Sequence, residues 1–207
     1  MATAVKICGI TRVEDALAAA HAGAHAIGLI FYAGSQRLVS HDVARRVVDA
    51  LPAFVTPVAL FVDARSTDVE RVISEVKPQL LQFHGDEPPQ FCERFGLPYI
   101  KAVKVRPGVD LLQYARRYRT AKSLLLDAFV AGSHGGTGST FDWALVPDQL
   151  PLPLILAGGL HPDNVAAAML RVRPWAVDVS SGVEAATGIK DAAKIAAFIR
   201  GVRNADV

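Results

Sequence analysis

Cys8 and Asp127 each carry an acid–base side chain at the end of a short apolar run. Cys8 closes the run Val5–Cys8 and precedes a glycine, and Asp127 closes Ser123–Asp127. Such residues have either a chemical or a structural role. Free cysteine is more often a buried structural residue. An aspartate beside an apolar run is solvated, capping, paired or functional, because burying it without a partner is costly. Both residues are candidates for catalysis.

The residue two positions before Cys8 is expected to affect its chemistry. Side chains two apart in a strand share a face, so Lys6 and Cys8 point into the interior of the fold, whereas Val5 and Ile7 point toward covering helices. A nearby ammonium favours the thiolate. We therefore expect Lys6 to lower the pKa of Cys8 from its ordinary value of about 8.5.

Two further charged residues are candidates for binding a ligand. Asp178 is inside the apolar run Ala176–Val179, which implies either a ligand or an internal salt bridge, with Lys6 or Lys101 as the partner. Arg37 lies in the loop after the second apolar run. Its guanidinium can bind a carboxylate through two parallel hydrogen bonds, although a solvated loop charge is the commoner use of such a residue.

Gln82 and His84 flank Phe83 at the end of the fourth apolar run. Residues so spaced in a strand share a face, so both side chains are expected to point the same way. A single histidine is more often structural than catalytic. By itself, His84 therefore indicates only a polar group at the end of a strand.

Two glycine motifs near the end of the sequence are typical of phosphate binding. Each follows an apolar run, where backbone N–H groups can face an anion and glycine lets the backbone approach closely. Either motif alone is compatible with an ordinary turn, and a third glycine-rich loop is a second donor site or a flexible lid. The predicted phosphate-binding residues are Gly158, Gly159, Ser180, Ser181, Gly182 and, in the third loop, Gly136.

Eight short apolar runs alternate with amphipathic helical stretches along the sequence. Most runs are apolar throughout, as expected for parallel strands covered on both faces. One strand–helix unit per about 26 residues fits a small closed (β/α)8 TIM barrel, whose active site lies where the strands end. The alternative, an open doubly wound sheet, typically has fewer strands. The expected strands are Val5–Cys8, Ala26–Phe31, Pro57–Val62, Leu80–Phe83, Tyr99–Val103, Ser123–Asp127, Leu152–Ala157 and Ala176–Val179. The expected helices are Val13–Ala22 with Thr11 as N-cap, Ser40–Leu51 with Ser40 as N-cap, Thr67–Val76, Pro88–Phe95, Asp110–Tyr118, Asn164–Leu170 and Asp191–Val202.

Composition limits the partners and the compartment. The 207 residues are 51% hydrophobic and carry a net charge of +2 with interspersed signs, which favours one buried core and excludes nucleic acid or a membrane surface as partner. No linker divides residues 1–207, so a single catalytic domain is expected. The two cysteines, Cys8 and Cys92, give neither a disulfide framework nor metal-ligand spacing. We expect a cytoplasmic protein with no metal and no cofactor.

Short motifs along nearly the whole chain belong to one pattern. They are Lys6–Thr11, Gln82–Glu87, Leu126–Ala128, Gly135–Gly138, Phe141–Trp143, Ala157–Leu160, Asp163–Val165, Asp178–Glu184 and Gly188–Asp191. Each motif is weak alone, but their combination and order are specific. Together they resemble the phosphoribosylanthranilate isomerase family of tryptophan biosynthesis.

The resemblance implies a cofactor-free Amadori rearrangement that converts the aminoaldose N-(5-phosphoribosyl)anthranilate into the ketose 1-(2-carboxyphenylamino)-1-deoxyribulose 5-phosphate. It implies that Cys8 is the general base and Asp127 the general acid, and that Arg37 meets the anthranilate carboxylate. It also implies that the glycine and serine loops bind the phosphate. The expected substrate-binding residues are Arg37, Gln82, His84 and Asp178. Gln36, Ser139 and Thr187 depart from the family's usual residues, and none of them is the proposed acid or base.

The residues leave two other functions possible. One is another phosphate-binding barrel enzyme, such as a pentose-phosphate epimerase or a histidine-pathway isomerase, and such enzymes usually use metals or carboxylate pairs. Turnover of a second aminoaldose also stays open. The other is a non-catalytic phosphate binder, against which the retention of Cys8 and Asp127 argues. For the oligomeric state, a monomer is the default expectation.

Overall fold

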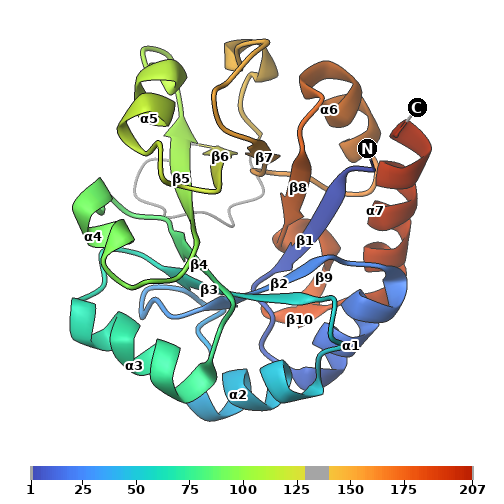
Figure 1. The fold of residues 1–207 in the computed structure, drawn as a ribbon. Coiled ribbons are helices and arrows are strands. Elements are labelled where there is room, and N and C mark those ends of the chain that lie inside the picture. Colours follow the sequence, from blue (N-terminus) through green and yellow to red (C-terminus); the bar gives the residue numbers. More distant parts are fainter. Residues whose placement is uncertain (1, 129–139, 207) are drawn as a thin grey trace.

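The computed structural model describes residues 2–128 and 140–206. Eight parallel strands pair in chain order, and β8 pairs with β1 to close a barrel, with helices on the outside (Figure 1). This confirms the predicted (β/α)8 barrel. The strands are β1 (Ala4–Cys8), β2 (Ala26–Ile30), β3 (Thr56–Phe61), β4 (Leu80–Phe83), β5 (Tyr99–Val105), β6 (Ser123–Ala128), β7 (Leu154–Leu156) and β8 (Ala176–Val179). The helices are α1 (Val13–Ala22), α2 (His41–Ala50), α3 (Ser66–Val76), α4 (Pro89–Glu93), α5 (Leu111–Arg117), α6 (Val165–Val172) and α7 (Ala192–Ala205).

The strands separate two apolar layers. Val5 and Ile7 of β1 belong to the large core between the strands and the helices, whereas Leu125 and Ile155 belong to a smaller cluster on the opposite face of the sheet. This alternation is the period of two expected of strands. It sends Lys6 and Cys8 inward, as the sequence predicts.

The ends of the first two helices differ from each other. The Ser40 hydroxyl accepts a hydrogen bond from the backbone N–H of Val43 at 3.3 Å and caps α2 as predicted. The prediction that Thr11 caps α1 is wrong. Arg12 is the N-cap residue, and the Thr11 hydroxyl instead donates to the carbonyl of Gly188. Thr11 thus ties the loop after β1 to a distant part of the chain.

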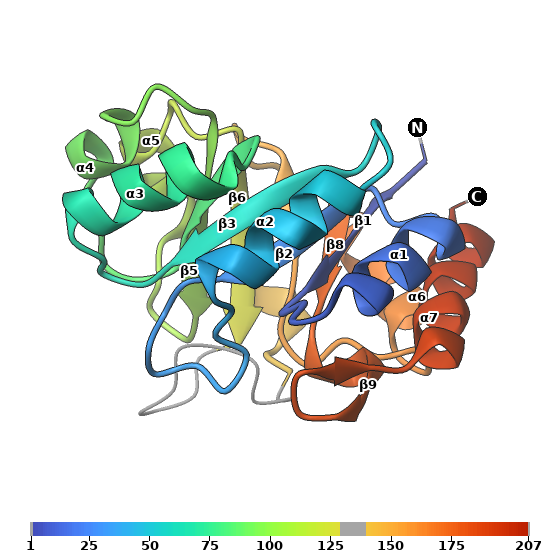
Figure 2. The same cartoon turned by 90° about the horizontal axis from the view of Figure 1, so that it is seen from below.

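That distant part is a small antiparallel hairpin that the sequence analysis did not anticipate. It follows a 3₁₀ turn, η2 (Ser181–Val183), and consists of β9 (Glu184–Ala186) and β10 (Ile189–Lys190). Figure 2 shows β9 near one end of the barrel, whereas the N-terminus lies near the other. Because β9 and β10 come between β8 and α7, the hairpin lies at the carboxyl ends of the strands.

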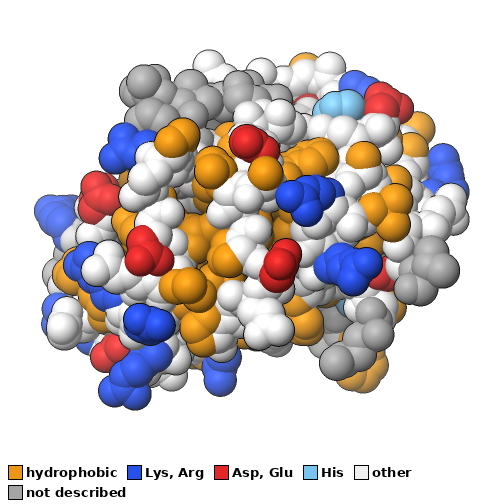
Figure 3. All heavy atoms as spheres, turned by 90° about the horizontal axis from the view of Figure 1, so that it is seen from above, with side chains coloured by type: hydrophobic (Ala, Val, Ile, Leu, Met, Phe, Trp, Pro, Cys, Tyr) orange, Lys and Arg blue, Asp and Glu red, His pale blue; other side chains and the backbone are white. Residues whose placement is uncertain are grey.

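The barrel wall between β6 and β7 is covered differently from the rest. Within the described residues, this connection contains only the 3₁₀ turn η1 (Trp143–Leu145) and no α-helix. Loop side chains such as Phe141 and Leu150 pack against the core in its place. Figure 3 looks onto this side and shows hydrophobic side chains among scattered charges. In the part of the chain that is described, no helix is long and apolar enough to span a membrane.

Candidate active site

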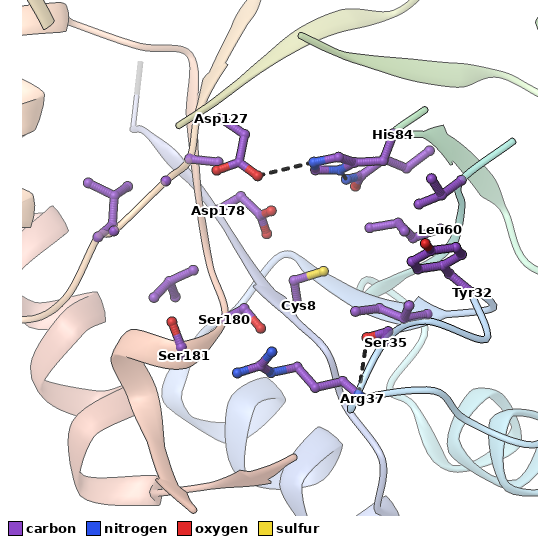
Figure 4. Close-up of a pocket in the computed structure, with 18 residues that line it drawn as sticks. Cys8, Tyr32, Ser35, Arg37, Leu60, His84, Asp127, Asp178, Ser180 and Ser181 are labelled. Carbon is purple, nitrogen blue, oxygen red and sulfur yellow. Dashed lines mark hydrogen bonds and ion pairs between the residues drawn. The ribbon is translucent and has the colours of Figure 1, made fainter. Parts of the chain in front are cut away.

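A pocket opens at the carboxyl ends of the barrel strands (Figure 4). Cys8 is the last residue of β1, Asp127 is next to last in β6, and the loops after β7 and β8 complete the pocket wall. Most of the predicted site residues meet here, although they come from distant parts of the sequence. Those lining the pocket are Cys8, Arg37, Gln82, His84, Asp127, Gly158, Gly159, Asp178, Ser180 and Ser181.

Lys6 and Asp178 form a buried ion pair in the barrel interior. Their Nζ and Oδ1 atoms lie 2.8 Å apart, and β1 and β8 place the two residues opposite each other in the sheet register. Burial opposes the charged ammonium, but Asp178 and Cys8 together outweigh it and raise the pKa of Lys6. Asp178 therefore makes an internal salt bridge and also lines the pocket, so both uses left open by the sequence are compatible.

Cys8 is 4% exposed, and its thiol packs over Gly28 of β2. A Cβ atom at Gly28 would lie 2.6 Å from the Cys8 sulfur, so glycine leaves the room that the thiol occupies. Burial raises the pKa of Cys8, and Asp178 adds to the rise, while Lys6 opposes it without reversing it. The prediction that Lys6 lowers the pKa of Cys8 below its ordinary value is therefore wrong. Asp178 compensates much of the Lys6 charge.

Asp127 belongs to a short hydrogen-bonded chain with His84 and Gln82. The Asp127 Oδ2 atom lies 3.1 Å from His84 Nε2, and His84 Nδ1 lies 3.0 Å from Gln82 Nε2. In this arrangement the Gln82 amide donates to Nδ1, so a neutral His84 carries its proton on Nε2 and donates to Asp127. The other carboxylate oxygen of Asp127 accepts from the backbone N–H of Ala128 at 2.8 Å. Because both of its oxygens have hydrogen-bond partners, the carboxyl group of Asp127 is held in one orientation.

Arg37 is not a solvated loop charge. Its Nε and Nη2 atoms donate to the two carboxylate oxygens of Glu184 at 2.7 and 2.8 Å, and its side chain is only 12% exposed. Glu184 also accepts from Lys190 Nζ at 2.9 Å. Burial disfavours the Glu184 carboxylate, but hydrogen bonds and charge from Arg37 and Lys190 outweigh it and lower the pKa of Glu184.

The glycine loops pack tightly at the pocket edge. A Cβ atom at Gly158 would lie 2.5 Å from the backbone nitrogen of Ala128, so only glycine lets the loop after β7 approach β6 this closely. Gly182 is not a pocket-lining residue. A Cβ atom there would lie 2.0 Å from the Leu160 carbonyl oxygen, so Gly182 lets the loops after β7 and β8 pack against each other. Gly136 lies outside the described residues.

Comparison with known proteins identifies the family. Residues 5–201 match the family described as N-(5'phosphoribosyl)anthranilate (PRA) isomerase. The chain belongs to this family. It is 60% identical to the N-(5'-phosphoribosyl)anthranilate isomerase of Nitrosospira multiformis over 98% of this chain and 97% of that protein. Its fold matches the phosphoribosyl anthranilate isomerase of Thermotoga maritima with a TM-score of 0.89 and 42% identity, covering 98% of this chain and 99% of that one.

A second solved structure of the phosphoribosylanthranilate isomerase family holds a ligand. It is a complex with reduced 1-(o-carboxyphenylamino)-1-deoxyribulose 5-phosphate, and it matches this chain with a TM-score of 0.86 and 40% identity, over 98% of this chain and 99% of that one. A pocket for such a compound must accommodate an aromatic ring and two anionic groups. Among residues 2–128 and 140–206, no three His, Cys, Asp or Glu side chains are grouped so as to hold a metal ion.

Several residues of this isomerase pocket escaped the sequence analysis. One wall is largely apolar and is suited to an aromatic ring, and its residues are Ile30, Tyr32, Leu60 and Val62. Three of them lie at or just beyond the ends of β2 and β3, a position that could have singled them out. Glu184 and Lys190 were also missed as partners of Arg37. Each is in a family motif, but no local spacing in the sequence links them to residue 37.

Proposed function

We propose that this chain isomerises N-(5-phosphoribosyl)anthranilate to 1-(2-carboxyphenylamino)-1-deoxyribulose 5-phosphate in tryptophan biosynthesis, with Cys8 as general base and Asp127 as general acid. One observation carries the proposal. The thiol of Cys8 and the carboxyl of Asp127 line one pocket, beside the glycine loop after β7 and the serine loop after β8. Membership of the isomerase family supports the same reaction.

The chemistry assigns one proton transfer to each residue. Asp127, entering protonated, gives its proton to the furanose ring oxygen while the C1–O bond breaks, and the nitrogen lone pair forms the C1=N bond of a protonated Schiff base. The thiolate of Cys8 then removes the proton from C2, and those electrons neutralise the Schiff base to give an enolamine. The enolamine tautomerises to the aminoketose. Each positioned group typically contributes about 10²–10⁴-fold to such a rate.

The remaining pocket residues orient the substrate. We assign the phosphate to the backbone around Gly158 and Gly159 and to the loop of Ser180 and Ser181. Loops after the last strands of such barrels commonly bind a phosphate group. Arg37 is assigned to the anthranilate carboxylate, and the apolar wall to the anthranilate ring. Holding both ends of the substrate places C1 and C2 between the acid and the base, which lowers the entropic cost of reaction.

A turnover assay with matched variants tests these roles. Consumption of the fluorescent anthranilate substrate is followed for the wild type, Cys8→Ser and Asp127→Asn. Each variant is expected to lose about 10²–10⁴-fold in kcat and to keep its affinity for the reduced product. Cys92→Ala, which changes the buried cysteine outside the pocket, is the control and retains activity. Near-full activity of either Cys8→Ser or Asp127→Asn refutes the corresponding role.

We make further proposals about the ligand, the cofactor, the cellular location and the oligomeric state of this enzyme. The ligand is a small phosphorylated metabolite, no cofactor takes part, and residues 1–207 act as one catalytic domain in the cytoplasm. We propose a monomer, and sedimentation equilibrium tests it, since one relative from Thermotoga maritima is described as dimeric. Turnover by protein dialysed against a chelator tests the absence of a metal requirement.

A further inference from the structure

Glu184 holds the guanidinium of Arg37 although the two residues are far apart in the sequence. Arg37 lies in the loop after β2 and Glu184 begins β9, 147 residues later. The two side chains meet through paired hydrogen bonds of 2.7 and 2.8 Å, which fix both the direction and the plane of the guanidinium. Within residues 2–128 and 140–206, Arg37 Nη1 makes no hydrogen bond, and Arg37 lines the pocket.

The Glu184 carboxylate is itself held in place. Its Oε1 atom accepts from Lys190 Nζ at 2.9 Å and from the backbone N–H of Gly188 at 3.3 Å, and its backbone carbonyl accepts from Lys194 Nζ at 2.7 Å. The Glu184 side chain is 7% exposed. A carboxylate with this many donors has little freedom to rotate, so it can hold Arg37 in a single orientation.

Lys190 extends the network to the serine loop. Its Nζ atom, on a side chain with no exposed surface, donates to the Ser180 carbonyl at 3.0 Å and lies 3.4 Å from the Ser180 hydroxyl. The series Arg37, Glu184, Lys190 and Ser180 therefore joins the loop after β2 to the loop after β8. Both loops line the pocket, and Figure 4 shows the Arg37 guanidinium pointing toward Ser180 and Ser181.

The charges in this network leave a positive surplus beside the pocket. Arg37 and Lys190 supply two cations against the one carboxylate of Glu184, whereas Lys6 and Asp178 balance each other nearby. An arginine held on one edge by a carboxylate keeps its charge and offers its free edge to an anion. Such an arrangement suits a carboxylate ligand better than an unanchored arginine, because less side-chain entropy is lost on binding.

We propose that Glu184 is a positioning residue, which presents Arg37 to the carboxylate of the anthranilate ring. This inference rests on the proposed function, because it takes the Arg37 role from it. Glu184 acts through Arg37 and does not itself touch the reacting atoms. Its loss should weaken the binding of ligands that carry the anthranilate carboxylate and should spare ligands that lack it.

The test compares two ligands and four proteins, the wild type and three variants. Binding of reduced 1-(o-carboxyphenylamino)-1-deoxyribulose 5-phosphate and of ribulose 5-phosphate, which lacks the anthranilate group, is measured by calorimetry for the wild type, Glu184→Gln, Arg37→Ala and the double variant. Glu184→Gln replaces one acceptor oxygen of the paired hydrogen bonds with a donor. We expect about 10- to 100-fold weaker binding of the reduced product, a similar rise in KM, a smaller change in kcat and nearly unchanged binding of ribulose 5-phosphate.

The double variant separates positioning from a structural role. If Glu184 acts through Arg37, Glu184→Gln has little further effect on reduced-product affinity once Arg37 is alanine. Additive losses, or equal losses for both ligands, overturn the inference. Glu75→Gln is the matched control, because it changes an exposed carboxylate that also bonds an arginine, Arg71. Thermal unfolding checks that each variant folds, and Glu184→Asp, which keeps the charge but shortens the reach, replaces any variant that does not.

Failure of the inference is distinguishable from failure of the proposed function. Wild-type turnover of N-(5-phosphoribosyl)anthranilate is measured first, and its absence would refute the function. Where the wild type turns over substrate and Glu184→Gln matches it in KM and in reduced-product affinity, the function stands and the positioning role is wrong.

Discussion

The Nε2 atom of His84 lies 3.1 Å from the Oδ2 atom of Asp127, and both residues are almost completely buried at the base of the pocket. Gln82 occupies the other ring nitrogen of His84 and so fixes the ring. The proposed acid therefore has a directed hydrogen-bond partner. A carboxyl that must deliver a proton to one atom of a substrate benefits from such a partner, because its orientation is set before the substrate binds.

Removal of the histidine ring should reduce catalysis more than binding. His84→Ala leaves Asp127 with its backbone partner only, and leaving a buried polar group without one of its partners typically costs about 1–3 kcal/mol. We expect kcat to fall about 10- to 100-fold and KM to change less. Steady-state kinetics with the fluorescent substrate measure both. His21→Ala, at an exposed position of α1, is the control. A variant that changes KM alone would indicate that His84 binds substrate without orienting Asp127.

The raised pKa of Cys8 predicts how activity depends on pH. The base must be a thiolate, and the thiolate fraction of Cys8 in the free enzyme should rise with pH and level off only above the ordinary pKa of a thiol, because burial favours the neutral form. Asp178→Asn removes a carboxylate that raises the pKa of Cys8 and frees the Lys6 ammonium to interact with the thiolate. The rising limb should therefore move to lower pH in this variant.

Two measurements check the effect of Asp178. The pH profile of kcat/KM reports groups of the free enzyme, and the pH dependence of iodoacetamide alkylation at Cys8, read by peptide mass spectrometry, reports the thiol directly. Alkylation separates a pKa change from any loss of substrate contact. A rising limb that stays in place or moves to higher pH would show that Asp178 does not control the thiol.

The sequence predicted the barrel because its main determinants are local. Continuous apolar runs mark buried parallel strands, helical periodicity marks the covering helices, and the ends of the strands mark the site. The contacts between loops were not predictable in this way. Thr11 bonds to Gly188, and Arg37 bonds to Glu184, across long stretches of chain that carry no periodic pattern. The pKa of Cys8 was also mispredicted, since one neighbouring charge is visible in the sequence but burial and the compensating carboxylate are not.

Another buried ion pair stabilises the loop that carries His84. Lys101 Nζ lies 2.8 Å from Glu87 Oε2 and also donates to the carbonyls of Phe83 and Gly85, on either side of His84. Both charged side chains are 2% exposed. Lys101→Met leaves the Glu87 carboxylate buried without its cation, which typically costs about 3–5 kcal/mol.

Urea denaturation measures the change in the free energy of unfolding for Lys101→Met. The double variant Lys101→Met/Glu87→Gln should recover part of the loss, because no uncompensated charge remains. Arg65→Ala breaks an exposed pair with Asp68 and should leave the stability nearly unchanged. Equal stability of Lys101→Met and the wild type would show that this ion pair does not stabilise the native state.

Gly9 and Gly96 provide a matched pair that separates backbone strain from packing at the site. Both have positive φ angles, of 73° and 68°, so alanine at either position should cost about 1–2 kcal/mol of stability. Their surroundings differ. A Cβ atom at Gly9 would lie 2.6 Å from Cδ of Arg37 and 2.9 Å from the Ser180 hydroxyl, whereas a Cβ atom at Gly96 would meet no atom within 4 Å.

Gly9→Ala should therefore displace the stem of Arg37, while Gly96→Ala should not. We expect similar losses of unfolding free energy from backbone strain in the two variants, with an additional packing loss in Gly9→Ala, and a raised KM in Gly9→Ala alone. Urea denaturation and steady-state kinetics measure the two effects on the same preparations. Because Arg37 is held by Glu184, its stem cannot swing away without breaking that ion pair. A normal KM in Gly9→Ala would mean that the arginine can move and still bind substrate, contrary to the rigid network inferred from its hydrogen bonds.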